Sequence, residues 1–366
     1  MHQFLTLIER RLRFAQGKPE SVSKVDHESR DSGHSRIAEL DVLRGFSALT
    51  VMMYHYTTIY VYGKDPGIPY GVLAVNLFFM ISGFVIFMTL SHTRTALDFI
   101  VSRFSRLFPV FWAAVLISQT VAWLFPSLSE FTLTWHEALV NLTMLAGPLH
   151  VRWVDNVYWS LVVELTFYAI MLGLFLIGIM KHIERLVLPW LLLQVVAAMV
   201  SNRNIHIPDV VTVLFLLKYA HLFLAGILCY RIRFEGLTAT RQMLLACCLA
   251  TQFAVKGSWA GIFALFFFTL FYLMSLQRLG WIAVRPLVFL GTISYSLYLV
   301  HQNIGYVIMR SLATAPRTVQ VTVAMVAALL LATLLTFMIE RPALHSIRVI
   351  YKRFKAGPSS EHQIIK

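Results

Sequence analysis

An arginine and a histidine interrupt one apolar stretch of the chain. Arg44 and His55 lie in LDVLRGFSALTVMMYHY, residues 40–56, where most other side chains are apolar. A guanidinium donates paired hydrogen bonds to phosphate or carboxylate, and an imidazole exchanges protons near neutral pH. Eleven residues are almost three helical turns, so both side chains share one face of a helix. The spacing therefore predicts a helix lining a cavity with an anion-binding end and an acid–base end.

Further ionisable residues lie inside apolar segments, where a charge is costly unless it faces a cavity or a partner. They are Glu164, Lys218, His221 and His301, with Asn76 and Ser82 as weaker polar members. A helical rise of 1.5 Å per residue places His55, Glu164 and His301 each about 21 Å from the inner face of the membrane. We therefore expect Glu164 to orient the His55 imidazole, and His301 to assist it, contact the acceptor, or pack.

Each of these residues also has a structural interpretation. Arg44 could extend toward inner headgroups, and His55 could be a packing residue with satisfied hydrogen bonds. Lys218 and His221 share a helical face, but no motif connects them to the other residues. Their role stays open at this point.

Composition indicates the environment of these residues. Of 366 residues, 58% are hydrophobic and only 13% are charged, with a mean hydropathy of +0.70. Too few polar residues remain to cover a soluble protein, so an all-α polytopic membrane protein is predicted. The net charge of +13 does not indicate nucleic acid, because the basic residues fall in short loops between apolar runs. The three cysteines form no CxxC pair, so neither a disulfide framework nor a metal site is expected.

About ten apolar segments are long enough to be membrane-spanning helices. They are 41–62, 71–91, 107–125, 158–180, 186–201, 212–230, 242–256, 259–277, 287–309 and 319–339. The loop after the second segment is expected to carry Arg94, Arg103 and Arg106. Basic residues concentrate on the side of this loop, which places both termini in the cytoplasm, although Arg310 and Arg317 fall on the other side.

Three regions follow from this pattern. Residues 1–37 are expected to form a partly disordered cytoplasmic arm, residues 38–345 the membrane domain, and residues 346–366 a basic cytoplasmic tail.

Six segments, in order, resemble the acyltransferase family 3 of integral membrane proteins. The first contains Arg44, ten intervening residues and His55. The others are NLFFMISGFVI (76–86), RFSRLFP (103–109), WSLVVELTFY (159–168), SYSLYLVHQ (294–302) and IERP (339–342). The family often has Gly at Val42, an acid at Asn76 and a second acid at Leu165. The Asn76 departure leaves one fewer buried carboxylate and gives more weight to Glu164.

The resemblance implies transfer of an acyl group, most often acetyl, from cytoplasmic acyl-CoA to a carbohydrate or lipid-linked sugar. It also implies a multi-pass protein of the bacterial inner membrane. In this interpretation His55 is the base, Glu164 its partner, and Arg44, Arg103 and Arg106 bind the phosphates of coenzyme A. No permanently bound cofactor is expected. The alternative for Arg103 and Arg106 is a purely topological role, although their i,i+3 spacing gives them one helical face.

The remaining site candidates concern substrate positioning. Ser82 and Gly83 are expected to break the second helix near mid-membrane, where a backbone donor to the oxyanion could arise. Direct transfer or a transient acyl-histidine is favoured over an acyl-serine, because the Gly-x-Ser-x-Gly turn is absent. Trp159 and Tyr168 could stack on sugar rings or act as interfacial anchors. Asn76 and His301 complete the set.

Two other classes of function compete with acyl transfer. A secondary transporter or flippase would also place charged groups in its spans. The sequence shows neither an internal repeat nor paired interrupted spans to support it. A structural or partner-recruiting membrane protein would tolerate apolar replacements of Arg44, His55 and Glu164.

Overall fold

The computed structural model describes residues 37–59, 71–129 and 132–356. Within these ranges every regular element is a helix, and no strand occurs among them. The chain divides into two units, Met1–Ile37 and Ala38–Lys366. The description below concerns the second unit, since most of the predicted N-terminal arm and the last ten residues of the predicted tail lie outside the described residues.

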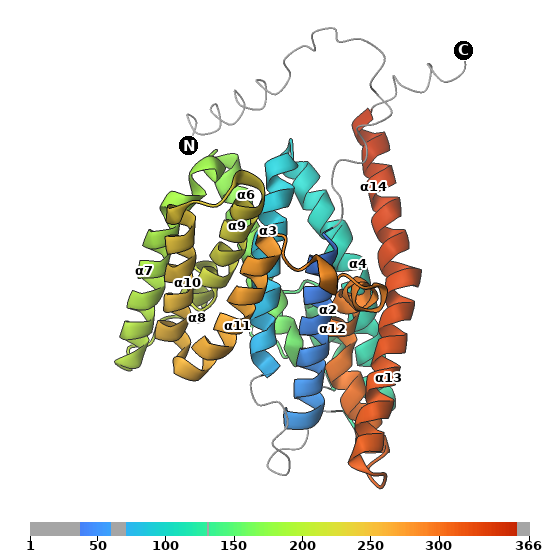
Figure 1. Cartoon of the computed structure of the whole chain (residues 1–366). Coiled ribbons are helices and arrows are strands. Elements are labelled where there is room, and N and C mark those ends of the chain that lie inside the picture. Colours follow the sequence, from blue (N-terminus) through green and yellow to red (C-terminus); the bar gives the residue numbers. More distant parts are fainter. Residues whose placement is uncertain (1–36, 60–70, 130–131, 357–366) are drawn as a thin grey trace, which may run out of the picture. The chain divides into compact units, whose positions relative to one another are not determined.

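Thirteen α-helices follow one another in the described part of the chain, and Figure 1 shows their arrangement. They are α2 (Ala38–Tyr54), α3 (Ala74–His92), α4 (Ala96–Leu124), α5 (Trp135–Asn141), α6 (Trp159–Leu176), α7 (Ile183–Asn202), α8 (Asp209–Leu214), α9 (Ala220–Glu235), α10 (Ala239–Lys256), α11 (Ser258–Ser275), α12 (Arg285–Ser311), α13 (Arg317–Leu335) and α14 (Arg341–Ala356). Two π-helical turns extend α2 and α13, at His55–Ile59 and Thr336–Glu340.

Among the described residues, six helical segments are long and apolar enough to cross a membrane. They are Ala74–His92, Ala96–Leu124, Asn156–Leu176, Met180–Asn202, Ser258–Ser275 and Arg317–Lys355. The all-helical prediction is therefore confirmed for the described residues. The count of ten spans and the orientation of the termini remain predictions.

The third predicted span begins too late. Helix α4 starts at Ala96, not at 107, because Thr95 and Asp98 form a reciprocal capping box with both N···O distances at 3.2 Å. Arg103 and Arg106 are good helix formers and continue the helix through the predicted loop. Both arginines consequently lie on a helix, and their i,i+3 spacing places them on one helical face.

The sixth predicted span, 212–230, is interrupted. Helix α8 ends at Leu214 and α9 begins at Ala220, with Leu216 between them at φ 51°. The interruption is tolerated because the buried Gln194 side chain donates to the carbonyls of Leu216 (3.2 Å) and Leu217 (3.1 Å). Backbone groups released from a helix need such partners in a water-poor setting.

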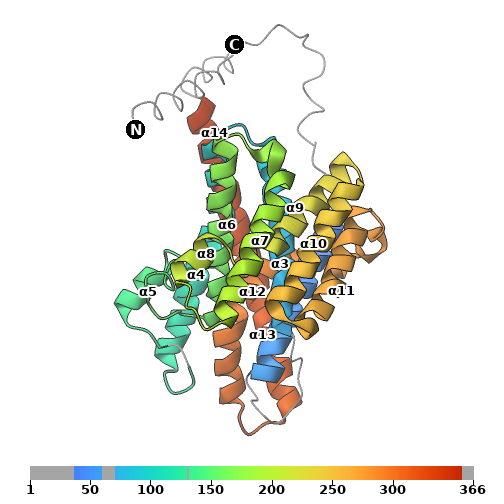
Figure 2. The same cartoon turned by 90° about the vertical axis from the view of Figure 1, so that its left-hand side faces the viewer.

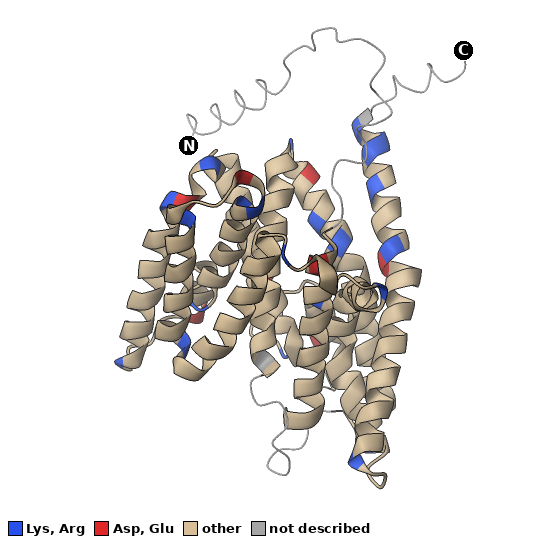
Figure 3. Cartoon of the chain, in the orientation of Figure 1, with Lys and Arg blue, Asp and Glu red and all other residues tan. Residues whose placement is uncertain are grey.

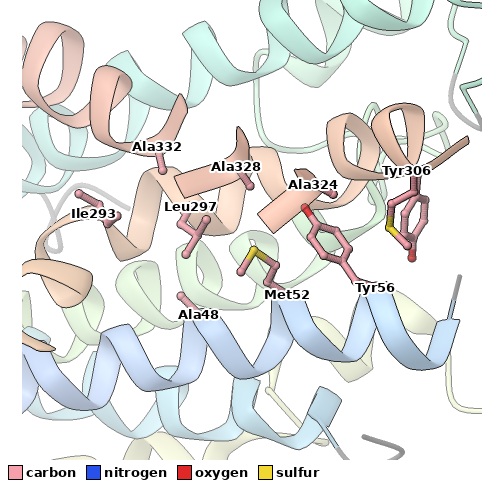
Figure 4. Packing of buried hydrophobic residues seen from close by; sticks show 10 residues of the cluster. Ala48, Met52, Tyr56, Ile293, Leu297, Tyr306, Ala324, Ala328 and Ala332 are labelled. Atoms are coloured by element: carbon pink, nitrogen blue, oxygen red, sulfur yellow. The ribbon is translucent and has the colours of Figure 1, made fainter. Parts of the chain in front are cut away.

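Helices α2, α12 and α13 share one apolar core (Figure 4). Its side chains recur every third or fourth residue, apart from one longer gap in α12, as a helical face requires. They are Ala48, Met52 and Tyr56; Ile293, Leu297, Tyr306 and Met309; and Ala324, Ala328 and Ala332. The Tyr56 hydroxyl also donates to the carbonyl of His301 at 2.7 Å. This core fixes the helix that carries Arg44 and His55 against the helix that carries His301.

Helix α3 runs unbroken through Ser82 and Gly83, so the predicted break is wrong. Gly83 instead allows α3 and α9 to touch: a Cβ there would lie 2.0 Å from the carbonyl oxygen of Phe223. Gly226 on α9 has the reciprocal role, because its Cβ would lie 1.9 Å from the Met80 carbonyl oxygen. The backbone N–H of Gly83 lies within a continuous helix, where it bonds inside the helix and offers no oxyanion donor.

Candidate functional site

Five helices surround a polar cavity, here called the arginine cavity. It is lined by Arg44 of α2; Val75, Phe78, Phe79, Ile81 and Ser82 of α3; Arg103, Arg106 and Leu107 of α4; Ser160, Leu161, Glu164 and Tyr168 of α6; and Ser294, Tyr295 and Tyr298 of α12. Six of the predicted site residues therefore converge on one cavity. They are Arg44, Ser82, Arg103, Arg106, Glu164 and Tyr168.

Two of the three arginines bring unused hydrogen-bond donors to this cavity. Within the described part of the chain, Arg44 makes no hydrogen bond or ion pair. Arg103 donates through Nη2 to Ser102 Oγ at 3.1 Å, and its buried Nε has no partner. A buried donor without a partner costs roughly 1–3 kcal/mol. An anion bound between these two side chains would recover that cost.

The third arginine is already paired. The Arg106 Nη1 group forms an ion pair with Oε1 of Glu340, whose side chain is 2% exposed. Ser296 Oγ donates to the other Glu340 oxygen at 3.0 Å. Glu340 ends the π-helical turn after α13, and such turns occur often at functional sites. The structure thus leaves Arg44 and Arg103 as the cations available to a ligand.

Glu164 lines the same cavity as these arginines and accepts hydrogen bonds from two hydroxyl donors. Ser82 Oγ and Tyr168 Oη both hydrogen-bond to its Oε1 atom. Glu164 makes no hydrogen bond to His55 in the described structure, although their common depth suggested one. The carboxylate therefore belongs to the arginine cavity.

His55 and His301 form a second cluster. His301 Nε2 lies 3.1 Å from His55 Nδ1, and the ring centroids are 5.1 Å apart. The other nitrogen of His301, Nδ1, lies 2.9 Å from the Tyr298 carbonyl oxygen and 3.2 Å from that of Leu297. Carbonyl oxygens only accept, so His301 Nδ1 carries the proton and its Nε2 carries a lone pair.

This pattern fixes the tautomer of His55. Because His301 Nε2 is an acceptor, His55 Nδ1 must donate, and the Val51 carbonyl oxygen at 2.9 Å is a second acceptor for it. The remaining nitrogen of His55, Nε2, then holds the free lone pair. His55 begins the π-helical turn after α2, so both π-helical turns among the described residues carry an ionisable site residue.

The two clusters are adjacent but distinct. Neither His55 nor His301 lines the arginine cavity. Tyr298 connects them, since it lines the cavity and its ring lies 5.8 Å from the His301 ring. Phe78 also lines the cavity and contacts Tyr298 edge-on at 5.5 Å. These two rings form the boundary between the arginine cavity and the histidine pair.

Three predicted positions lie in neither cluster. Asn76 is buried in α3 at 6% exposure and does not line the cavity. Gly83 is a helix-packing position. Trp159 contacts the rings of Phe79 and Tyr219 and lines a different cavity, considered below.

Sequence reasoning missed Glu340 and the tyrosines of α12. Glu340 stands in the quoted IERP segment, but a carboxylate next to an arginine in sequence gave no reason to expect a partner on α4. Ser294 and Tyr298 are four residues apart, and this helical spacing could have predicted a polar face on α12. Tyr295 lines the cavity as well, and its hydroxyl donates to the Leu107 carbonyl at 3.1 Å.

His221 and Lys218 do not join this site. The His221 ring is fully buried and lies 2.6 Å from Gln252 Oε1 and 3.3 Å from Gln194 Nε2, so it links α7, α9 and α10. Lys218 is exposed in the turn before α9. Among the residues that the structure covers, no cluster of three His, Cys, Asp or Glu side chains could hold a metal ion.

A bundle of apolar helices around an internal cavity with three arginines defines a polytopic membrane protein. Residues 37–339 match the model of acyltransferase family 3, described as an acyltransferase domain, and the chain belongs to this family. It is similar to the exopolysaccharide production protein ExoZ of Rhizobium meliloti (strain 1021), with 30% identity over 315 residues that cover 78% of this chain and 93% of that protein. No solved structure matches the chain. The family resemblance is therefore confirmed, and the protein is an integral membrane acyltransferase.

Proposed function

We propose that this enzyme transfers an acetyl group from cytosolic acetyl-CoA to a hydroxyl of a surface carbohydrate or its lipid-linked precursor. The observation that carries the proposal is a pair of arginines, Arg44 and Arg103, with unused donors in a cavity shared with Glu164. The acceptor class is supported by the Rhizobium relative, which is named for exopolysaccharide production. The setting that fits such an acceptor is the bacterial inner membrane.

The proposed orientation places the arginine cavity within reach of the cytosol. Both termini are cytoplasmic, and ten helices span the membrane. The distribution of basic residues supports this arrangement, since Lys and Arg gather toward the end of the second unit at which α14 projects (Figure 3). Helix α14 is held to α4 at that end by a Lys355–Asp98 ion pair of 2.7 Å.

Coenzyme A would bind through its phosphates. Arg44 and Arg103 supply planar donor groups that suit phosphate oxygens, while Glu340 neutralises Arg106 and holds it at the cavity wall. The thin pantetheine arm then extends along α2. Arg44 and His55 are separated by about 16 Å along the helix axis, which is a span that this arm can cover. The thioester reaches the histidine pair by passing the boundary formed by Phe78 and Tyr298.

His55 Nε2 is the proposed base. It removes the acceptor proton while the acceptor oxygen attacks the thioester carbonyl carbon. The carbon–sulfur bond then breaks, and the departing thiolate receives the proton from the imidazolium. If the reaction instead takes two steps through a transient acyl-histidine, the same nitrogen carries the acyl group. His301 accepts the hydrogen bond from His55 Nδ1 throughout and so keeps Nε2 available.

The test is acetyl transfer in membranes supplied with radiolabelled acetyl-CoA, with each variant's abundance measured. Arg44→Ala and Arg103→Ala should each raise the KM for acetyl-CoA at least tenfold, because a charge-assisted hydrogen bond contributes roughly 1.5–3 kcal/mol. Arg278→Ala is the matched control, since that side chain is exposed and lies outside the cavity. Label that never enters a glycan or lipid fraction in the wild type would refute the proposed function.

A further inference from the structure

A second cavity lies beside the arginine cavity, and the acyl-transfer mechanism above does not use it. It is lined by the segment 145–153, one face of α6, helix α8 and the turn that follows α8. Helix α8 packs beside α6 (Figure 2). Three half-buried aromatic residues, Trp153, Trp159 and Tyr219, line this space, here called the aromatic cavity.

Helix α6 is a common wall of the two cavities. Its residues Ser160, Leu161, Glu164 and Tyr168 line the arginine cavity, whereas Trp159, Val162, Val163 and Thr166 line the aromatic cavity. The two sets occupy different faces of one helix. Whatever enters the aromatic cavity is therefore held against the helix that carries Glu164.

Contacts between aromatic rings connect the linings of the two cavities beyond α6. Phe79 lines the arginine cavity, and its ring centroid lies 5.0 Å from that of Tyr219 and 6.2 Å from that of Trp159. The Trp159 and Tyr219 rings, 5.5 Å apart, line the aromatic cavity. We call these three rings the aromatic partition. Rings in contact can rotate apart without breaking a hydrogen-bonded network.

The polar groups of the aromatic cavity suit hydroxyl groups. Asp209 accepts hydrogen bonds, Lys218 donates them, and Thr166 and Thr212 can do either. Aromatic faces with a few convergent polar groups are the usual construction of a small-molecule site, and ring faces fit the C–H faces of a pyranose. A phospholipid tail would need none of these polar groups.

We propose that the aromatic cavity is the acceptor site and holds one sugar ring of the carbohydrate that receives the acyl group. The proposal rests on the proposed function, because the donor must occupy the neighbouring arginine cavity. The sugar stacks between Trp153 and the aromatic partition. Its hydroxyl groups bond to the polar side chains of α8 and the following turn. Opening of the partition then admits the acceptor hydroxyl to the arginine cavity, from which it follows the thioester past Phe78 and Tyr298 to His55.

The experiment measures sugar binding separately from transfer. The probe is the oligosaccharide repeat released by mild acid from the surface polysaccharide of a strain lacking the gene, deacetylated with base and tritiated at its reducing end. Equilibrium dialysis against the purified enzyme in detergent gives its Kd. A parallel arm presents the lipid extract of the same strain in vesicles and separates a lipid-linked sugar from a free one.

Thr166→Phe fills the cavity and removes only a hydroxyl that bonds to the Val162 carbonyl of its own helix. It should weaken binding of the oligosaccharide or the lipid-linked sugar at least tenfold. Trp153→Ala should weaken that binding similarly, whereas Trp281→Leu, an exposed residue outside the cavity, should not. Acetyl-CoA binding should be unchanged in all three variants, which shows that they are folded.

Three outcomes would overturn the proposal. The first is unchanged sugar affinity in Thr166→Phe, and the second is no binding of either probe by the wild type. The third is release of bound phospholipid by Thr166→Phe with sugar affinity unchanged, which would make the cavity a lipid site. Failure of the proposed function would give a different result. The wild type would bind the sugar and Thr166→Phe would not, but the wild type would transfer no acetyl group.

Discussion

In the proposed mechanism, the two acceptors of the His55 Nδ1 proton, His301 and the Val51 carbonyl, determine which atom of His55 can react. His301 has both nitrogens engaged, with Nδ1 on two backbone carbonyls and Nε2 on His55. It resembles the orienting member of a catalytic triad in holding the base in one tautomer. It differs in being neutral, so the imidazolium of His55 gains no ion pair from it. The stabilisation of that cation comes from the hydrogen bonds of His55 Nδ1 to His301 and to the Val51 carbonyl.

Substitutions at position 301 test this role. His301→Leu removes one of the two acceptors of the His55 Nδ1 proton and leaves only the Val51 carbonyl, so the imidazole is less well oriented and its cation less stabilised. We expect kcat to fall roughly a hundredfold, at the low end for lost acid–base catalysis. His301→Gln retains an acceptor oxygen and should recover at least a tenth of the wild-type kcat. Both are measured as initial rates of acetyl transfer at saturating acetyl-CoA.

The KM for acetyl-CoA provides the control, because the arginine cavity is not lined by His301. It should be the same in both variants and the wild type. A His301→Leu enzyme with full kcat would show that the hydrogen bond between His55 and His301 does not matter to the reaction.

Helix packing sets the position of the site, and the α3–α9 contact is one of the closest between helices. Gly83→Ala puts a methyl group 2.0 Å from the Phe223 carbonyl oxygen, so the helices must separate. We expect a loss of about 3 kcal/mol in the free energy of unfolding, at the upper end for overpacking. Thermal unfolding in detergent measures it.

Gly173 on α6 is the matched control. It is also in a helix, and a Cβ added there would have no other atom within 4 Å. Gly173→Ala should raise stability by about 0.5–1 kcal/mol, because alanine loses less backbone entropy on folding. Equal destabilisation by the two substitutions would contradict the packing explanation for Gly83.

The connection between α4 and α6 contains an ion pair, here called the clasp, whose contribution to stability depends on pH. Arg152 donates to both oxygens of Glu137 at 2.8 and 2.9 Å, and the Thr134 backbone donates at 2.9 Å. The hydrogen bonds from Arg152, followed by that from the Thr134 backbone, lower the pKa of Glu137 from 4.5 to about 2. The unfolded segment binds its proton near pH 4.5, so the stabilisation is complete above this pH and declines as the pH falls toward 2.

Hydrogen exchange of the segment 134–154 measures this effect. After correction for intrinsic rates, protection should decrease between pH 4.5 and the lowest accessible pH. Glu137→Gln should have lower protection above pH 4.5 and no pH-dependent step. A wild-type segment with constant protection over this range would show that the clasp contributes nothing.

The sequence predicted the positions of the helices better than it predicted which helices pack against each other. Apolar runs located the helices, and the i,i+3 spacing placed Arg103 and Arg106 on one face even though the helix itself was missed there. Depth along a helix, by contrast, gives the level of a side chain in the membrane but not the direction in which the side chain points. His55, Glu164 and His301 were placed at one level, but only the packing of α2 on α12 shows that His55 faces His301 and that Glu164 faces Ser82.

Other errors have similar causes. Gly83 could serve as a helix break or as a contact with another helix, and only the presence of α9 distinguishes the two. The interruption before Ala220 depends on Gln194, a residue on a different helix. Interactions between distant segments decided each of these cases.

At the scale of the whole molecule, the positions of the charges determine which cavity faces which compartment. The proposed topology puts the C-terminal end of α14 in the cytoplasm and the turn between α7 and α8, residues 203–208, outside. Green fluorescent protein fused after residue 366 should fluoresce, and alkaline phosphatase fused after residue 206 should be active. The reverse result at either site would invalidate the assignment of the arginine cavity to the cytosol.

The aromatic partition has a consequence for the cell as well as for the reaction. An energised membrane stores a voltage and a proton gradient, and any continuous column of water through a protein would discharge both. Phe79, Trp159 and Tyr219 present hydrocarbon faces at the narrow point between the two cavities. If the two cavities face opposite compartments, these closed rings interrupt any such column and so preserve the gradient.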